Sequence, residues 1–154
     1  MNTFSKWKAY FADKHYNFDN EPITAFMTLW MCFNGYYNRF HKDTERMRVC
    51  ELATNKKAQW VYNCYKDEIL KSFSVIPYKD EKIRTFVANT SSRFNAEYNE
   101  NKCSLKDFLN AVYQIRCNLF HGQKCPFIDA DVKLVKWAYE NLYKILHNFN
   151  NELF

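Results

Sequence analysis

The stretch Ala25–Tyr37 reads AFMTLWMCFNGYY, and its large aromatic residues recur at the spacing of an α-helix. These residues are Phe26, Trp30, Phe33 and Tyr37. Because an α-helix turns once in about 3.6 residues, positions three and four apart lie on the same face. Pro22 precedes the stretch, and proline is typical of the first turn of a helix. The sequence therefore predicts a helix from about Pro22 to Phe40 that buries one aromatic face.

The composition of the chain favours an all-helical domain. It has 154 residues, of which 47% are hydrophobic and 19% aromatic, so it can bury a core of its own. Only 2 glycines and 3 prolines occur, which is too little turn chemistry for a sandwich or barrel of many short strands. We therefore predict one all-α domain over residues 1–154, a bundle of about five to seven helices.

Apolar residues at helical spacing mark the other helices. They cover residues 4–11, 44–54, 57–73, 82–95 and 105–121, and a last helix is capped by Asp129 or Asp131 and ends near Asn150. The predicted buried stripe of this last helix consists of Val135, Tyr139, Leu142, Leu146 and Phe149. Ser104 and Asp107 resemble a capping box. Gly122 stands where a glycine ends a helix. Since the link between the last two helices is short, these helices should pack as antiparallel neighbours.

Charge and hydropathy narrow the class of protein. The net charge of +5 and the pI near 8.8 are compatible with a nucleic-acid partner without demanding one. No apolar run approaches the ~20 residues of a membrane span, and the N-terminal residues lack the core of a signal peptide. We therefore expect a cytoplasmic protein that has no membrane partner.

The cysteines and glycines suggest no metal or cofactor site. None of the six cysteines forms a C-x-x-C pair, so in a reducing cytosol they are simple thiols. Cys117, His121 and Cys125 have C-x3-H-x3-C spacing, but the fourth ligand that structural zinc requires is not evident. The two glycines are isolated and form no phosphate-binding loop. We expect neither a metal nor a cofactor.

The run Arg116–Lys124, RCNLFHGQK, places charged and proton-transferring side chains beside the predicted helix end. Arg116 falls within the apolar stripe of the helix over 105–121. That stripe consists of Leu105, Phe108, Leu109, Val112, Ile115, Leu119 and Phe120. A buried guanidinium must reach a carboxylate, backbone carbonyls, a subunit interface or an anionic ligand. His121 lies about 140° from Arg116 around the helix. Convergence of the two requires a loosened last turn, the reach of the arginine, or a second copy across a dimer.

Such a run has the parts for cleavage of RNA without a metal. Arg116 would stabilise the charge that develops on the phosphate. His121 would move a proton for attack by the 2′-hydroxyl group. Asn118 and Lys124 would supply supporting contacts. The Arg-x4-His spacing alone is weak, however, because Arg116 could instead pair with a core acid and His121 could cap its helix.

Three further residues are candidates for supporting roles. Asn34 lies at the edge of the aromatic face, where a buried hydrogen-bonding role is favoured over an RNA contact. Lys133 and Lys136 lie on the polar face of the last helix. They are either solvated charges or residues that guide RNA toward the motif.

Two stretches together resemble a known family. Residues 115–124, IRCNLFHGQK, resemble the R-N-x-L-F-H-G-x-K form of the R-x4–6-H motif of HEPN domains. The stretch Ala25–Tyr37 resembles the early aromatic helix of the same families, which often reads F-x-x-x-W-x-x-F-N-x-x-Y. The resemblance implies a HEPN-like helical bundle and a metal-independent endoribonuclease, such as a toxin or defence effector. It implies Arg116 and His121 as the catalytic pair.

The resemblance also implies partners. HEPN enzymes commonly form homodimers through the motif face, and toxins of this kind have antitoxin or other protein partners, with RNA as the substrate. Cys117 stands where the family often has a polar residue directly after the arginine. Some HEPN proteins are not catalytic. The alternative is therefore a non-catalytic HEPN-like module that dimerises or binds a partner protein or a nucleotide.

Overall fold

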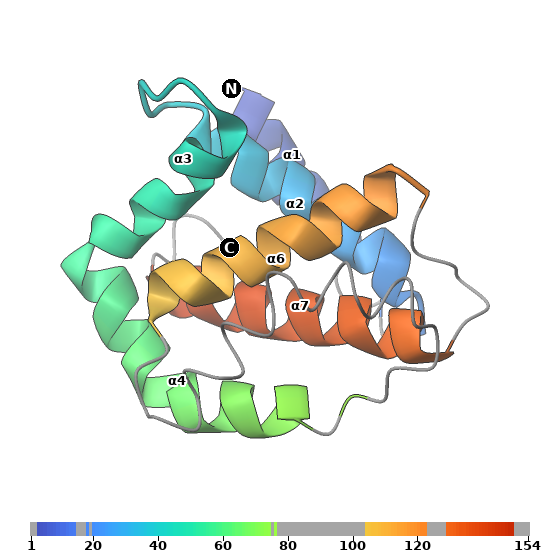
Figure 1. The fold of residues 1–154 in the computed structure, drawn as a ribbon. Helices are drawn as coiled ribbons and strands as arrows, with labels where there is room; N and C mark the ends of the chain where they lie inside the picture. The colour runs from blue at the N-terminus through green and yellow to red at the C-terminus, as the bar shows by residue number, and fades with distance from the viewer. Residues whose placement is uncertain are drawn as a thin grey trace.

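The computed structural model describes residues 3–14, 18, 20–74, 76, 104–122 and 129–149. Within these ranges the chain forms six α-helices and one 3-10 helix, and no strand (Figure 1). They are α1 (Thr3–Lys14), α2 (Pro22–Tyr37), α3 (Glu45–Cys50), η2 (Glu51–Thr54), α4 (Lys56–Ser74), α6 (Leu105–Phe120) and α7 (Asp129–Phe149). The predicted all-α bundle is confirmed. The helix predicted over residues 82–95 lies outside the described residues.

Helices α2 and α7 form the centre of the bundle. Helix α7 packs against both α2 and α4, while α1 packs on α2 and α3 packs on α6. Helices α6 and α7 are in contact and run in opposite directions, as predicted (Figure 1). No helix in the described part of the chain is both long enough and apolar enough to span a membrane.

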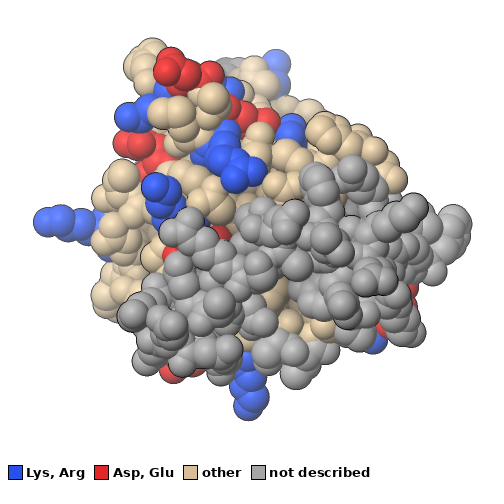
Figure 2. All heavy atoms as spheres, viewed as in Figure 1, with Lys and Arg blue, Asp and Glu red and all other residues tan. Residues whose placement is uncertain are grey.

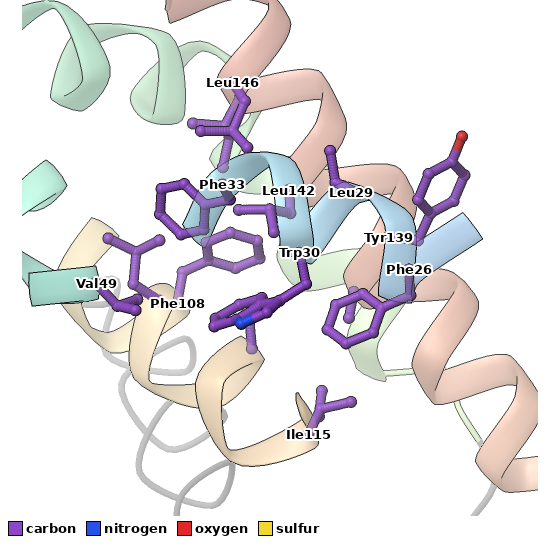
Figure 3. Close-up of a cluster of buried hydrophobic side chains, with 14 of the residues drawn as sticks. Phe26, Leu29, Trp30, Phe33, Val49, Phe108, Ile115, Tyr139, Leu142 and Leu146 are labelled. Atoms are coloured by element: carbon purple, nitrogen blue, oxygen red, sulfur yellow. The ribbon is translucent and has the colours of Figure 1, made fainter. Parts of the chain in front are cut away.

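Trp30 lies at the centre of the aromatic core. Its ring centroid is 5.9 Å from that of Phe26, 5.6 Å from that of Phe33 and 5.9 Å from that of Tyr37. All four side chains are buried, so the face predicted from their spacing is confirmed. Figure 3 shows the Trp30 indole among side chains of α2, α6 and α7. Helix α6 therefore packs onto the aromatic face through the segment that carries Arg116.

Local sequence signals set both ends of α6. The Ser104 hydroxyl accepts a hydrogen bond from the Asp107 N–H at 3.2 Å, and the Asp107 carboxylate accepts one from the Ser104 N–H at 3.2 Å. This pair is the predicted capping box. At the other end, Gly122 has φ of 71°, a conformation that favours glycine. The helix therefore ends at Phe120, with His121 as its C-cap residue and Gly122 directly after it.

Replacing Ser104 with alanine should lower the free energy of unfolding by about 1 kcal/mol, because the first turn of α6 loses its cap. Urea denaturation with circular dichroism measures the change. Asn63→Ala, at an exposed position inside α4, is the control and should cause no comparable loss. Equal stability of Ser104→Ala and wild type would show that the cap contributes nothing.

Two residues of the predicted apolar stripe in α6 are not fully buried: Leu119 is partly buried and Phe120 is exposed. Phe120 is 40% exposed, so its assignment to the buried face is wrong. It follows Arg116 by one helical turn, and the Arg116 Cζ lies 4.8 Å from the centre of its ring. Side chains at positions i and i+4 are neighbours on a helix surface. The Phe120 ring therefore packs on the Arg116 guanidinium and not in the core. The predicted α7 stripe is confirmed, with Val135, Tyr139, Leu142, Leu146 and Phe149 all buried.

Candidate functional site

Arg116 forms an ion pair with Glu45, the first residue of α3. The Arg116 Nη1 lies 3.2 Å from the Glu45 Oε2, and the two side chains are 23% and 22% exposed. The Arg116 Cζ also lies 5.8 Å from the centre of the Trp30 ring, so the cation rests between two aromatic faces. Of the partners that the sequence allowed for Arg116, the structure supplies a carboxylate.

Glu45 also connects Arg116 to the end of α2. Its Oε1 accepts a hydrogen bond of 2.5 Å from the Tyr37 hydroxyl, which in turn accepts one of 2.7 Å from the Asn34 Nδ2. Burial, together with the Glu45 carboxylate, raises the pKa of Tyr37. The phenol therefore stays protonated and donates to Glu45. We call Asn34, Tyr37, Glu45 and Arg116 the Arg116 network.

The start of α3 determines where Glu45 lies. Thr44 is the N-cap, and its hydroxyl accepts a hydrogen bond of 3.2 Å from the Met47 N–H. The carboxylate of Glu45 therefore stands in the first turn, where the helix dipole favours a negative charge. The sequence indicated a helix that begins near Thr44, but it did not single out Glu45. The only signal was an acid in the first turn of that helix.

His121 lies on the surface at the end of α6. Its backbone N–H donates a hydrogen bond of 3.0 Å to the Cys117 carbonyl, which continues the helical pattern. Its side chain is exposed. Within the described part of the chain, the imidazole makes no hydrogen bond or ion pair. The last turn is therefore not loosened, and Arg116 reaches toward Glu45. The two residues do not converge on one surface of this chain.

Asn118 belongs to the interior, unlike His121. It is 1% exposed, and its Oδ1 accepts a hydrogen bond of 2.9 Å from the Gln114 Nε2. Its Nδ2 is buried without a partner among the described residues. Asn118 precedes His121 by three residues and lies about 60° from it around the helix, on the side that faces the core. A direct contact of Asn118 with a ligand would require this end of α6 to open.

The lysines proposed as RNA contacts lie apart from this network. Lys133 pairs with Asp129 at 2.7 Å, and Lys136 lies 3.7 Å from Glu140, in both cases within α7. These charges are partly balanced by acids of their own helix. Lys124 lies outside the described residues.

Cys117 and Tyr113 line the side of α6 next to Arg116. The Cys117 Sγ lies 4.0 Å from the Arg116 Nη1. Burial and the neighbouring Cys117 thiol raise the pKa of Tyr113 to about 12, so Tyr113 is neutral at physiological pH. The described residues contain no group of three His, Cys, Asp or Glu side chains able to hold a metal ion. Cys125, the last residue of the C-x3-H-x3-C spacing, lies outside them.

The chain matches no model of a known protein family, no curated protein and no solved structure. Its function must therefore be inferred from its residues and their arrangement. Two groups stand out, the half-buried Arg116 network and the exposed His121 one turn beyond it.

Proposed function

We propose that this protein is a HEPN-like endoribonuclease that cleaves RNA without a metal ion. The supporting observation is an arginine held in place by Glu45 and two aromatic rings, followed five residues later by an exposed histidine without a described partner. The motif around Arg116 and the aromatic helix α2 are the sequence support. We place the enzyme in the cytoplasm.

In this mechanism His121 removes the proton from a ribose 2′-hydroxyl group. The 2′-oxygen forms a bond to phosphorus, and the bond from phosphorus to the 5′-oxygen breaks. A protonated His121 then supplies the proton that the 5′-oxygen takes up. Arg116 stabilises the negative charge on the non-bridging oxygens during attack. The products are a 2′,3′-cyclic phosphate end and a 5′-hydroxyl end.

The directions of Arg116 and His121 favour a site shared by two copies. On one chain the guanidinium points toward α2 and α3 while the imidazole faces outward. A homodimer formed through the end of α6 would bring His121 of one copy toward Arg116 of the other. Phe120, which is 40% exposed beside Arg116, is the apolar contact available for such an interface. The same surface would suit an antitoxin-like protein partner.

The first test is cleavage of single-stranded RNA by the purified protein in excess EDTA. We expect cleavage to continue, because no step uses a metal, and we expect 2′,3′-cyclic phosphate ends. An RNA with 2′-O-methyl groups should resist cleavage, because its attacking hydroxyl is blocked. Loss of all cleavage in EDTA, or equal cleavage of the methylated RNA, would rule out this mechanism.

A non-catalytic HEPN-like binding module is the second candidate. Its support is the Arg116–Glu45 ion pair, because a guanidinium that already has a carboxylate partner is less available to a phosphate. This candidate predicts a dimer by analytical ultracentrifugation and no cleavage of RNA under any condition. Cleavage that resists EDTA would exclude it.

A further inference from the structure

A groove lies between α3, η2 and α6, outside the residues of the Arg116 network. It has a volume of about 600 Å³ and is lined by α3, η2 and the N-terminal half of α6. Its lining residues are Lys42, Arg46, Met47, Cys50, Glu51, Ala53, Thr54, Lys106 and Asn110. We call it the α3–α6 groove. This volume is within the range of ~300–1,000 Å³ that is usual for ligand sites.

Positive charge is in excess in this groove. It holds three cations, Lys42, Arg46 and Lys106, against one acid, Glu51. Lys42 lies 3.7 Å from Glu51, so that acid is partly neutralised. Burial raises the pKa of the Cys50 thiol; the Lys106 and Arg46 charges oppose this rise, and the Asp107 carboxylate adds to it. Figure 2 shows Lys and Arg side chains beside α3, with Asp and Glu side chains among them.

Arg46 is positioned by α6. Its Cζ lies 5.0 Å from the centre of the Tyr113 ring, and its Nη2 donates a hydrogen bond of 3.2 Å to the Gln114 Oε1. An arginine that is already oriented loses less side-chain entropy when it binds an anion. The preceding residue, Glu45, reaches Arg116. Two adjacent residues of α3 therefore belong to the Arg116 network and to the lining of the groove.

The wall of the groove is suited to a nucleotide rather than to a simple anion. Met47 is 47% exposed, and it lines the groove together with Ala53 and the Cys50 thiol. An apolar surface can cover part of a base, while neighbouring cations bind its phosphate group. Asn110 and Thr54 add polar groups that can hydrogen-bond a base or a sugar.

We propose that the α3–α6 groove binds a single-stranded segment of RNA, with a phosphate between Lys42, Arg46 and Lys106. This inference rests on the proposed function, since it extends the path of the RNA away from the cleavage site. The groove would hold the strand while the scissile phosphate lies at the Arg116 network. It would thus contribute to affinity and leave the cleavage chemistry to Arg116 and His121.

The test is binding of a fluorescent 2′-O-methyl RNA, which cannot be cleaved, to the full chain. Replacing Lys42 and Lys106 together with glutamate should weaken binding by about tenfold or more, because two attractions to phosphate become repulsive. The milder Lys42→Gln and Lys106→Gln pair should lower the slope of log K against log salt by about 0.7 for each phosphate that is no longer neutralised. Lys6→Glu with Lys71→Glu, at exposed positions of α1 and α4, is the matched control.

Groove variants that bind RNA as the control pair does would overturn the proposal, whether or not the protein cleaves RNA. Binding of DNA but not RNA of the same sequence would overturn it as well. If the wild type binds through the groove and leaves unmodified RNA intact, the nuclease function fails while the groove assignment stands. Melting curves of all variants confirm that each one folds.

Discussion

Replacing His121 with alanine should reduce RNA cleavage by about 10²–10⁴-fold, the usual contribution of general acid–base catalysis. The side chain is exposed and makes no described hydrogen bond, so the fold should not depend on it. The melting temperature of the variant should therefore equal that of the wild type. Initial rates on a fluorogenic RNA measure the loss of activity.

His147→Ala is the matched control, because His147 is also an exposed histidine near the end of a helix. It should cleave RNA at the rate of the wild type.

A site shared by two copies also predicts that two inactive variants can restore activity when they are mixed. His121→Ala subunits mixed with Arg116→Lys subunits should regain activity, since one of the two shared sites then has both native residues. Equal cleavage by His121→Ala and wild type would remove His121 from the mechanism.

The ion pair between Arg116 and Glu45 should contribute measurably to stability. Glu45→Ala leaves a half-buried guanidinium without its carboxylate, and we expect a loss of about 1–3 kcal/mol in the free energy of unfolding. Removing one partner of a fully buried pair costs ~3–5 kcal/mol, and solvent reduces the loss here because about a fifth of each side chain is exposed. Urea denaturation measures it.

A double-mutant cycle isolates the pair from other effects. Arg116→Met removes the charge and keeps much of the apolar contact with Trp30 and Phe120. We expect a coupling energy of about 0.5–2 kcal/mol between Arg116 and Glu45. Strictly additive losses would show that the ion pair contributes nothing of its own.

The same two positions separate stability from catalysis. Arg116→Lys keeps the charge but lacks the planar guanidinium, so we expect cleavage to fall by about 10²–10³-fold. Glu45→Gln removes the competing negative charge while its amide oxygen can still accept from Tyr37. Cleavage by this variant should equal or exceed that of the wild type. If Glu45→Gln folds normally but does not cleave RNA, the Glu45 carboxylate itself takes part in the reaction.

The sequence predicted the elements of the fold well because their signals are local. The aromatic face of α2 follows from its spacing alone, and so does the buried stripe of α7. The ends of α6 follow from residues within one turn, Ser104 with Asp107 at the start and Gly122 at the end. Such signals depend on neighbours in the chain, which a sequence shows directly.

The contacts of the site could not be predicted, because they join distant parts of the chain. Glu45 is separated from Arg116 by 71 positions in the sequence (116 − 45), and only packing of α3 on α6 brings them together. The burial of Asn118 depends on how α6 rotates against the core, which a helical wheel does not fix. The rotation of α6 against the core also decides the exposure of Phe120, whose ring lies beside Arg116.

Two consecutive residues of helix α3 contact side chains of α6. Glu45 holds Arg116, while Arg46 rests on Tyr113 and donates to Gln114. We expect a substitution at Arg116 to leave Glu45 with only its Tyr37 hydrogen bond, and so to loosen the turn that also orients Arg46. Weaker RNA binding by an Arg116 variant is therefore no proof that Arg116 touches RNA. Experiments on this protein must separate what Arg116 contacts from what it holds in place.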